Sequence, residues 1–163
     1  MSLAVALQQL ANEVRPKTIH ILEQTADQEL CWAPATTSNH ILWHAGHAVW
    51  LGDVLCLEPI TSKTGLPPGW ADMFGANCKP VAQNKYWPAK AQVLSLLRAQ
   101  HRRINEELAR ITDEQLDLIL SPTSGATLGK WILHGLHDEA NHQGEMYLLL
   151  KIQRGLRKGV GRT

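Results

Sequence analysis

The chain is poor in cysteine, and the few cysteines that it has are isolated. Cys31, Cys56 and Cys78 are odd in number, and none belongs to a CxxC pair. This pattern argues against a disulfide framework and against a cysteine zinc knuckle. We therefore expect the protein to work in a reducing compartment.

Long apolar runs are also missing. No segment approaches the roughly 20 consecutive apolar residues that a membrane-spanning helix needs. Residues 1–14 show neither the basic start nor the apolar stretch of a secretion signal. These absences predict a cytoplasmic protein without a membrane partner.

An excess of charge of one sign is absent as well. Sixteen Lys and Arg residues against fifteen Asp and Glu residues give a formal net charge of +1. No field of the whole molecule therefore attracts nucleic acid. Basic residues gather only near the C-terminus, between Lys151 and Arg162, where no aromatic residues for base stacking are interleaved. We expect no nucleic-acid partner.

What the chain does contain is enough apolar sequence for one helical domain. Its 163 residues are 44% hydrophobic and 19% charged, as in ordinary globular proteins. We predict one domain over residues 1–155 and a flexible basic tail over residues 156–163, with Gly155 as the helix stop. Helical periodicity predicts long helices over residues 3–24, 38–57, about 88–108 and about 127–153.

Helix signals refine this division. Ser38 is the predicted cap of the second helix, and Pro59 its predicted end. Residues 60–87 are rich in Gly, Pro, Asn and Trp, which is typical of a long irregular connection. The predicted fold class is therefore all-α, a four-helix bundle with a long crossover between its second and third helices.

Two stretches of the chain resemble each other, and we call this weak internal similarity the echo. ILEQTADQELCWAP leads to HILWHAGH, and ELARITDEQLDLILSP leads to WILHGLH. Thr25 with Gln28, and Thr112 with Gln115, are candidate capping boxes. The echo predicts two similar helical hairpins whose second helices face each other.

Six of the eight histidines fall in two clusters. They are His40, His44 and His47 in the first cluster and His134, His137 and His142 in the second. At about 100° per residue, the first three share one helix face. In the second cluster Asp138 and His142 lie one turn apart with Glu145 on the same face, whereas His137 points about 100° away.

Imidazole nitrogens and a carboxylate one helical turn apart are suitable ligands for a divalent ion such as zinc. Asp138 and His142 supply such a pair, and the facing helix must supply a third ligand. His44 lies centrally in the apolar run and is the first candidate, with His47 as the alternative. The competing interpretation is that these histidines are core residues hydrogen-bonded to their neighbours.

These residues resemble the DinB-like superfamily of metal-dependent enzymes. The resemblance is carried by the histidine in ILWHAGH, the carboxylate four residues before the HxGQ-like HQGE, and the long crossover. It implies an up-up-down-down four-helix bundle, commonly dimeric, with the metal ligands at His44, Asp138 and His142. Many members have His where this chain has Asp138, and the usual Gln of the motif is Glu145.

Two imidazoles and one carboxylate leave an open metal position, which is typical of catalytic sites. These ligand types favour zinc, with nickel as the alternative. The resemblance implies a low-molecular-weight thiol, whose thiolate attacks a small-molecule electrophile. We therefore expect a metal-dependent thiol S-transferase, with Glu145 or His47 handling protons and a homodimer as the assembly. The alternatives are a metal-dependent hydrolase and a non-catalytic dimeric bundle.

Overall fold

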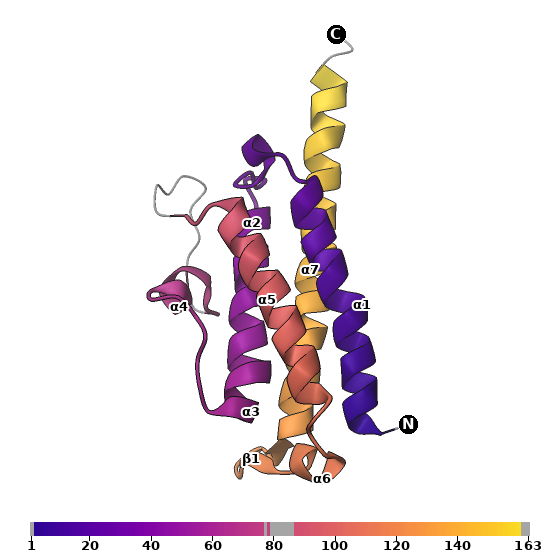
Figure 1. Cartoon of the computed structure of the whole chain (residues 1–163). Helices are drawn as coiled ribbons and strands as arrows, with labels where there is room; N and C mark the ends of the chain where they lie inside the picture. Colours follow the sequence, from indigo (N-terminus) through magenta and orange to yellow (C-terminus); the bar gives the residue numbers. More distant parts are fainter. Residues whose placement is uncertain (1, 77, 79–86, 161–163) are drawn as a thin grey trace.

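The computed structural model describes residues 2–76, 78 and 87–160, and helices dominate it (Figure 1). The long helices are α1 (Leu3–Gln24), α2 (Ile41–Leu51), α5 (Lys90–Leu108) and α7 (Leu128–Val160), and a π-helical segment η2 (Gly52–Leu57) extends α2. The short elements are η1 (Asp27–Glu29), α3 (Glu58–Thr61), α4 (Trp70–Phe74), α6 (Asp113–Leu116) and the antiparallel strands β1 (Ile119–Ser121) and β2 (Ala126–Thr127). The predicted all-α fold is confirmed, and the short hairpin is an addition to it. Among the described helices, none has both the length and the apolar character needed to cross a membrane.

The four long helices pack side by side. Helix α1 contacts α5 and α7, and α2 contacts the same two helices from the other side. In Figure 1, α1 and α7 run upward while α2 and α5 run downward. Along the chain, α1, α2, α5 and α7 therefore run up, down, down and up, which differs from the up-up-down-down order that the resemblance implies. The predicted meeting of the second helices of the two hairpins, α2 and α7, is confirmed.

The start of α2 differs from the prediction. The helix begins at Ile41, and its cap is His40 instead of Ser38. The Nδ1 atom of His40 accepts a hydrogen bond from the backbone N–H of Trp43 at 3.1 Å. A capping side chain satisfies a backbone donor that the first turn leaves without a partner. His40 therefore stabilises the helix start that carries His44.

Other boundaries shift for similarly local reasons. The predicted capping box of Thr25 and Gln28 is wrong: Thr25 is the C-cap of α1, and the backbone N–H of Ala26 donates to Glu29 Oε2 instead. The box of Thr112 and Gln115 is confirmed. The helical chain continues past Pro59 to the end of α3, since proline is tolerated in a first turn. The predicted irregular connection contains α4, while its residues 77 and 79–86 lie outside the described residues.

Helix α7 is longer than predicted. It continues through Gly155 to Val160, so residues 156–160 of the predicted flexible tail are helical, and residues 161–163 lie outside the described residues. Arg154 and Arg157 form ion pairs with Glu29 at 3.0 and 3.5 Å. These contacts attach the last turns of α7 to η1. A glycine alone does not end a helix when the following turn has such partners.

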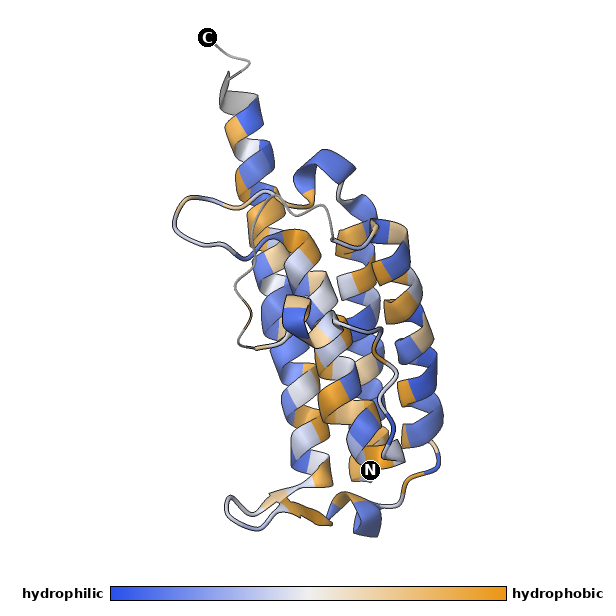
Figure 2. Ribbon diagram, turned by 90° about the vertical axis from the view of Figure 1, so that its left-hand side faces the viewer, coloured by the Kyte–Doolittle hydropathy of each residue, from blue (hydrophilic) through white to orange (hydrophobic). Residues whose placement is uncertain are grey.

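The core consists of two apolar clusters with a polar layer between them. Apolar and polar residues are interspersed along the long helices, as expected of helices with one buried face (Figure 2). Arg15, almost fully buried, donates to Glu139 Oε2 at 3.0 Å, to Gln100 Oε1 at 3.1 Å and to the carbonyl of Ala48 at 3.2 Å. Gln100 donates to the carbonyl of Val49 at 2.8 Å. This layer joins α1, α5 and α7 to α2 just before its π-helical segment.

Candidate metal centre

The predicted site residues meet where α2 packs against α7. His44 and His47 come from α2, and Asp138, His142 and Glu145 come from α7. Their possible donor atoms form two groups, each within 4.8 Å: one contains His44, His142 and Glu145, and the other contains His47, Asp138 and His142. Of the three predicted ligands, His44 belongs to the first group, Asp138 to the second and His142 to both.

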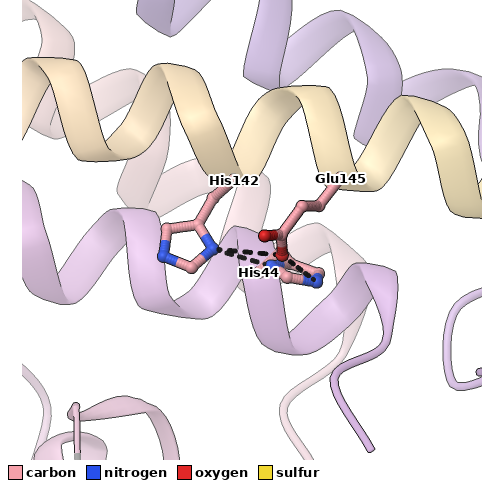
Figure 3. Close-up of side chains that lie close together, drawn as sticks. All are labelled: His44, His142 and Glu145. Atoms are coloured by element: carbon pink, nitrogen blue, oxygen red, sulfur yellow. Dashed lines mark hydrogen bonds and ion pairs between the residues drawn. The ribbon is translucent and has the colours of Figure 1, made fainter. Parts of the chain in front are cut away.

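The first group is a chain of close polar contacts (Figure 3). The Nδ1 atoms of His44 and His142 are 2.8 Å apart, which is a hydrogen-bond distance. On the other side of the His44 ring, Nε2 lies 3.3 Å from Glu145 Oε2. Two ligands of a tetrahedral zinc ion stand about 3.4 Å apart, given bonds of about 2.1 Å. The separation of His44 and His142 is therefore that of hydrogen-bond partners.

The second group is more widely spaced. His142 Nε2 lies 4.0 Å from Asp138 Oδ1, and the rings of His142 and His47 are 4.5 Å apart between centroids at an angle of 70°. The contact between His142 and Asp138 is too long for a hydrogen bond. To share an ion, His142 Nε2 and Asp138 Oδ1 would have to approach each other by about 0.6 Å to reach the tetrahedral separation.

His47 is held by three neighbours. Its Nδ1 atom lies 2.5 Å from the carbonyl oxygen of Phe74 in α4. A carbonyl only accepts, so Nδ1 carries the proton and Nε2 keeps its lone pair. The ring is stacked between Trp43 and Trp50, at centroid distances of 4.8 and 5.2 Å. Both the orientation and the tautomer of His47 are thus fixed before any ion binds.

Gly46 allows α4 to approach α2 so closely. A Cβ atom at this position would lie 2.2 Å from the ring of Phe74, whose carbonyl holds His47. We expect Gly46→Ala to destabilise the protein by about 1–3 kcal/mol through overpacking and to weaken metal binding. Urea denaturation and zinc titration measure the two effects.

Gly144 on the facing helix is the matched control for this prediction. A Cβ atom there meets no atom of the described residues within 4 Å. Gly144→Ala is therefore expected to stabilise the protein by about 0.5–1 kcal/mol, because alanine loses less backbone entropy in a helix. Equal effects of the two substitutions would contradict the assigned role of Gly46.

Burial keeps the imidazoles neutral. Desolvation and the neighbouring His142 lower the pKa of His44 to about 3. Burial likewise lowers the pKa values of His47 and His142. Burial and the charge of Asp138 raise the pKa of Glu145. Neutral imidazoles offer lone pairs, which is the form in which histidine binds a metal.

A cavity of about 400 Å³ adjoins the first group. Its wall combines three apolar side chains of α7 with polar residues from the segment before α2. The side chain of Glu145 is 56% exposed, whereas that of His44 is buried. The lining residues are Pro34, Thr36, Thr37, Asn39, His44, Glu145, Leu148, Leu149 and Ile152.

Comparison with known families agrees with the metal site that the geometry indicates. A family model described as the DinB superfamily matches residues 10–146, which is most of the chain and includes both histidine-bearing helices. The chain belongs to the DinB superfamily. A search of curated proteins finds no significant match. Membership in the DinB superfamily and the two groups of possible ligands fit a metal-dependent enzyme.

Some features of this DinB-superfamily site were missed in the sequence. The carbonyl of Phe74 comes from a segment that we predicted to be irregular, and a backbone group leaves no mark in the side-chain pattern. The only available signal was Gly46, a glycine between two histidines in an apolar helix. His134 and His137 are exposed on α7.

Proposed function

We propose that this DinB-superfamily protein is a metal-dependent thiol S-transferase whose zinc or nickel ion is held by His47, Asp138 and His142. The observation that supports this set most strongly is the hydrogen bond from His47 Nδ1 to the carbonyl of Phe74, which leaves Nε2 with its lone pair. The possible ligand atoms of His47, Asp138 and His142 lie within 4.8 Å of one another. The sequence left His44 and His47 as alternatives. The short contact between His44 and His142 favours His47 as the ligand from α2.

Three protein ligands leave a further coordination position for a substrate. When bound, the divalent ion would lower the pKa of a thiol at that position and supply a thiolate near neutral pH. The side chain of Asp138 is 32% exposed and that of His142 15% exposed, so the α7 side of the site is accessible to solvent. Trp43 and Trp50 keep the His47 ring in place from either side.

The neighbouring cavity supports a small-molecule electrophile as the second substrate. Leu148, Leu149 and Ile152 supply an apolar wall, and in the described part of the chain the lining residues include no lysine or arginine. Such a wall favours a substrate that is largely apolar and carries no negative charge. Glu145 lies between this cavity and His142, where it would accept a proton more readily than an ordinary glutamate because its pKa is raised by burial.

The homodimer that the resemblance implies stays a proposal. Its support is a set of exposed apolar side chains on α7, which a partner would remove from water. They are Leu133, Tyr147 and Leu156.

The first test is the metal content of protein purified without a histidine tag. We expect about one zinc or nickel ion per chain, or its recovery when zinc is added to metal-free protein. The loaded protein should then accelerate conjugation of a neutral bimane electrophile with a low-molecular-weight thiol, and the metal-free protein should not. Consumption of an ester without any thiol would favour the hydrolase, and a wild-type protein that binds neither zinc nor nickel would contradict both enzymes.

A further inference from the structure

We propose that His44 and Glu145 form a hydrogen-bonded relay that positions His142 for metal binding. The two overlapping groups of donors are then one site: three ligands and, behind one of them, two positioning residues. This inference rests on the proposed function for the identity of the ligands. The protonation pattern that it requires belongs to the protein without metal and is measurable separately.

The ring of His142 faces a different partner on each side. Its Nδ1 atom is 2.8 Å from Nδ1 of His44, within hydrogen-bond distance, and 3.8 Å from Glu145 Oε2, beyond that distance. Its Nε2 atom is 4.0 Å from Asp138, beyond that distance. The stronger constraint on the proton of His142 therefore comes from His44.

Two proton arrangements are possible along the chain of contacts, because each neutral imidazole has one N–H and one bare nitrogen. In the first, His142 Nδ1–H donates to His44 Nδ1, and His44 Nε2–H donates to Glu145. In the second, His44 Nδ1–H donates to His142, and the bare Nε2 of His44 faces Glu145 at 3.3 Å. An ionised carboxylate has no proton to donate, so it selects the first arrangement.

The first arrangement is the one that a metal ligand needs. It leaves Nε2 of His142 without a proton on the side of Asp138 and His47. The second arrangement would place a proton on that nitrogen and block the ion. Glu145, acting through His44, thus selects the tautomer of His142 that can bind metal.

The two imidazole ligands are then supported in the same way. His47 donates its Nδ1–H to the carbonyl of Phe74, and His142 donates its Nδ1–H to His44. A ligating histidine usually has such an acceptor behind it, since the acceptor fixes the ring and makes the coordinating nitrogen more basic. His44 is buried in the core, so its ring has little freedom to leave this position.

The first experiment is nitrogen NMR of the histidine rings in metal-free protein at pH 8. We expect His142 to carry its proton on Nδ1. Glu145→Gln should shift His142 toward the tautomer protonated on Nε2, because a glutamine amide can donate to His44 and so permits the second arrangement. The matched control is Glu106→Gln, which removes an exposed carboxylate of α5 and should leave the tautomer unchanged. A wild-type His142 protonated on Nε2, or no change in Glu145→Gln, would overturn the relay.

The second experiment is zinc affinity by competition with a chelating dye, with folding checked by circular dichroism. Glu145→Gln and His44→Leu should each weaken binding about 10–100-fold, the usual effect of losing a group that orients a ligand. His44→Asn should recover part of the loss, since its side-chain oxygen can accept the proton of His142 Nδ1. Glu106→Gln should bind as the wild type does.

The outcomes separate a relay from a ligand. If His44 were itself a ligand, His44→Leu would abolish binding and His44→Asn would not restore it, which would overturn the proposal. A wild-type protein that binds neither zinc nor nickel would refute the proposed function, while the NMR experiment would still decide the relay.

Discussion

Arg15→Met is expected to lower the free energy of unfolding by about 3–5 kcal/mol, the usual effect of removing one partner of a buried ion pair. The side chains of Arg15 and Glu139 are only 2% and 1% exposed, and their closest charged atoms are 2.8 Å apart. Methionine would leave the carboxylate of Glu139 buried without its cation. It would also remove the hydrogen bonds from Arg15 to Gln100 and to the carbonyl of Ala48.

The double substitution Arg15→Met and Glu139→Met is the control for this prediction. It removes both charges, so it should recover much of the stability that the single substitution loses. Urea denaturation of the two variants and the wild type at one pH measures the difference. A single variant as stable as the wild type would show that the pair contributes little.

The pH dependence of the single variant gives a second check. Burial raises the pKa of Glu139 in the native protein, and Arg15 opposes this rise. Without Arg15 the pKa of Glu139 should rise further above its value in the unfolded chain. A carboxyl group whose pKa is higher in the native protein than in the unfolded chain lowers the free energy of unfolding as the pH rises. The stability that Arg15→Met loses relative to the wild type should therefore grow from acid to neutral pH.

Features of the structure that depend on local periodicity were predictable. The bounds of α1 agree with the prediction, and Asp138 and His142 lie one turn apart on α7 as the spacing requires. The similarity of the two helical hairpins also predicted the contact between α2 and α7. The helix bounds and the one-turn spacing follow from local periodicity, whereas the contact between α2 and α7 was predicted from the repeated order of the elements.

Features that depend on neighbours distant in sequence were not predictable. His44 and His47 share a helix face, and they differ in what lies beside each ring: Glu145 beside His44 and the carbonyl of Phe74 beside His47. From the sequence alone, Arg15 resembles an ordinary surface charge. In the structure it is bound by Gln100 of α5 and Glu139 of α7. Helical spacing indicates which side chains share a face, but tertiary packing decides what each of them contacts.

The Arg15 layer also bears on the metal centre. Glu139 directly follows Asp138 on α7, and the Ala48 carbonyl that Arg15 binds belongs to the residue after His47 on α2. The layer therefore connects the two helices at the level of two proposed ligands. Its contribution to metal binding would act through the relative position of α2 and α7, whereas a ligand acts by direct contact.

His142→Ala is expected to abolish zinc binding, because His142 belongs to both groups of possible donors. Neither group keeps three donors without it. Binding to the native state alone stabilises a protein by about 2.7 kcal/mol when the free ligand is at 100 times its Kd. Thermal unfolding should therefore shift upward with zinc in the wild type and remain unchanged in His142→Ala.

His137→Ala is the matched control, since it removes an exposed imidazole from the same helix five residues earlier. It should retain the full zinc-dependent shift, whereas His47→Ala should lose the shift as His142→Ala does. Loss of the shift in His137→Ala would point to zinc bound by surface histidines. A shift retained in His142→Ala would exclude both donor groups, because the ion would then be held by residues outside the interface of α2 and α7.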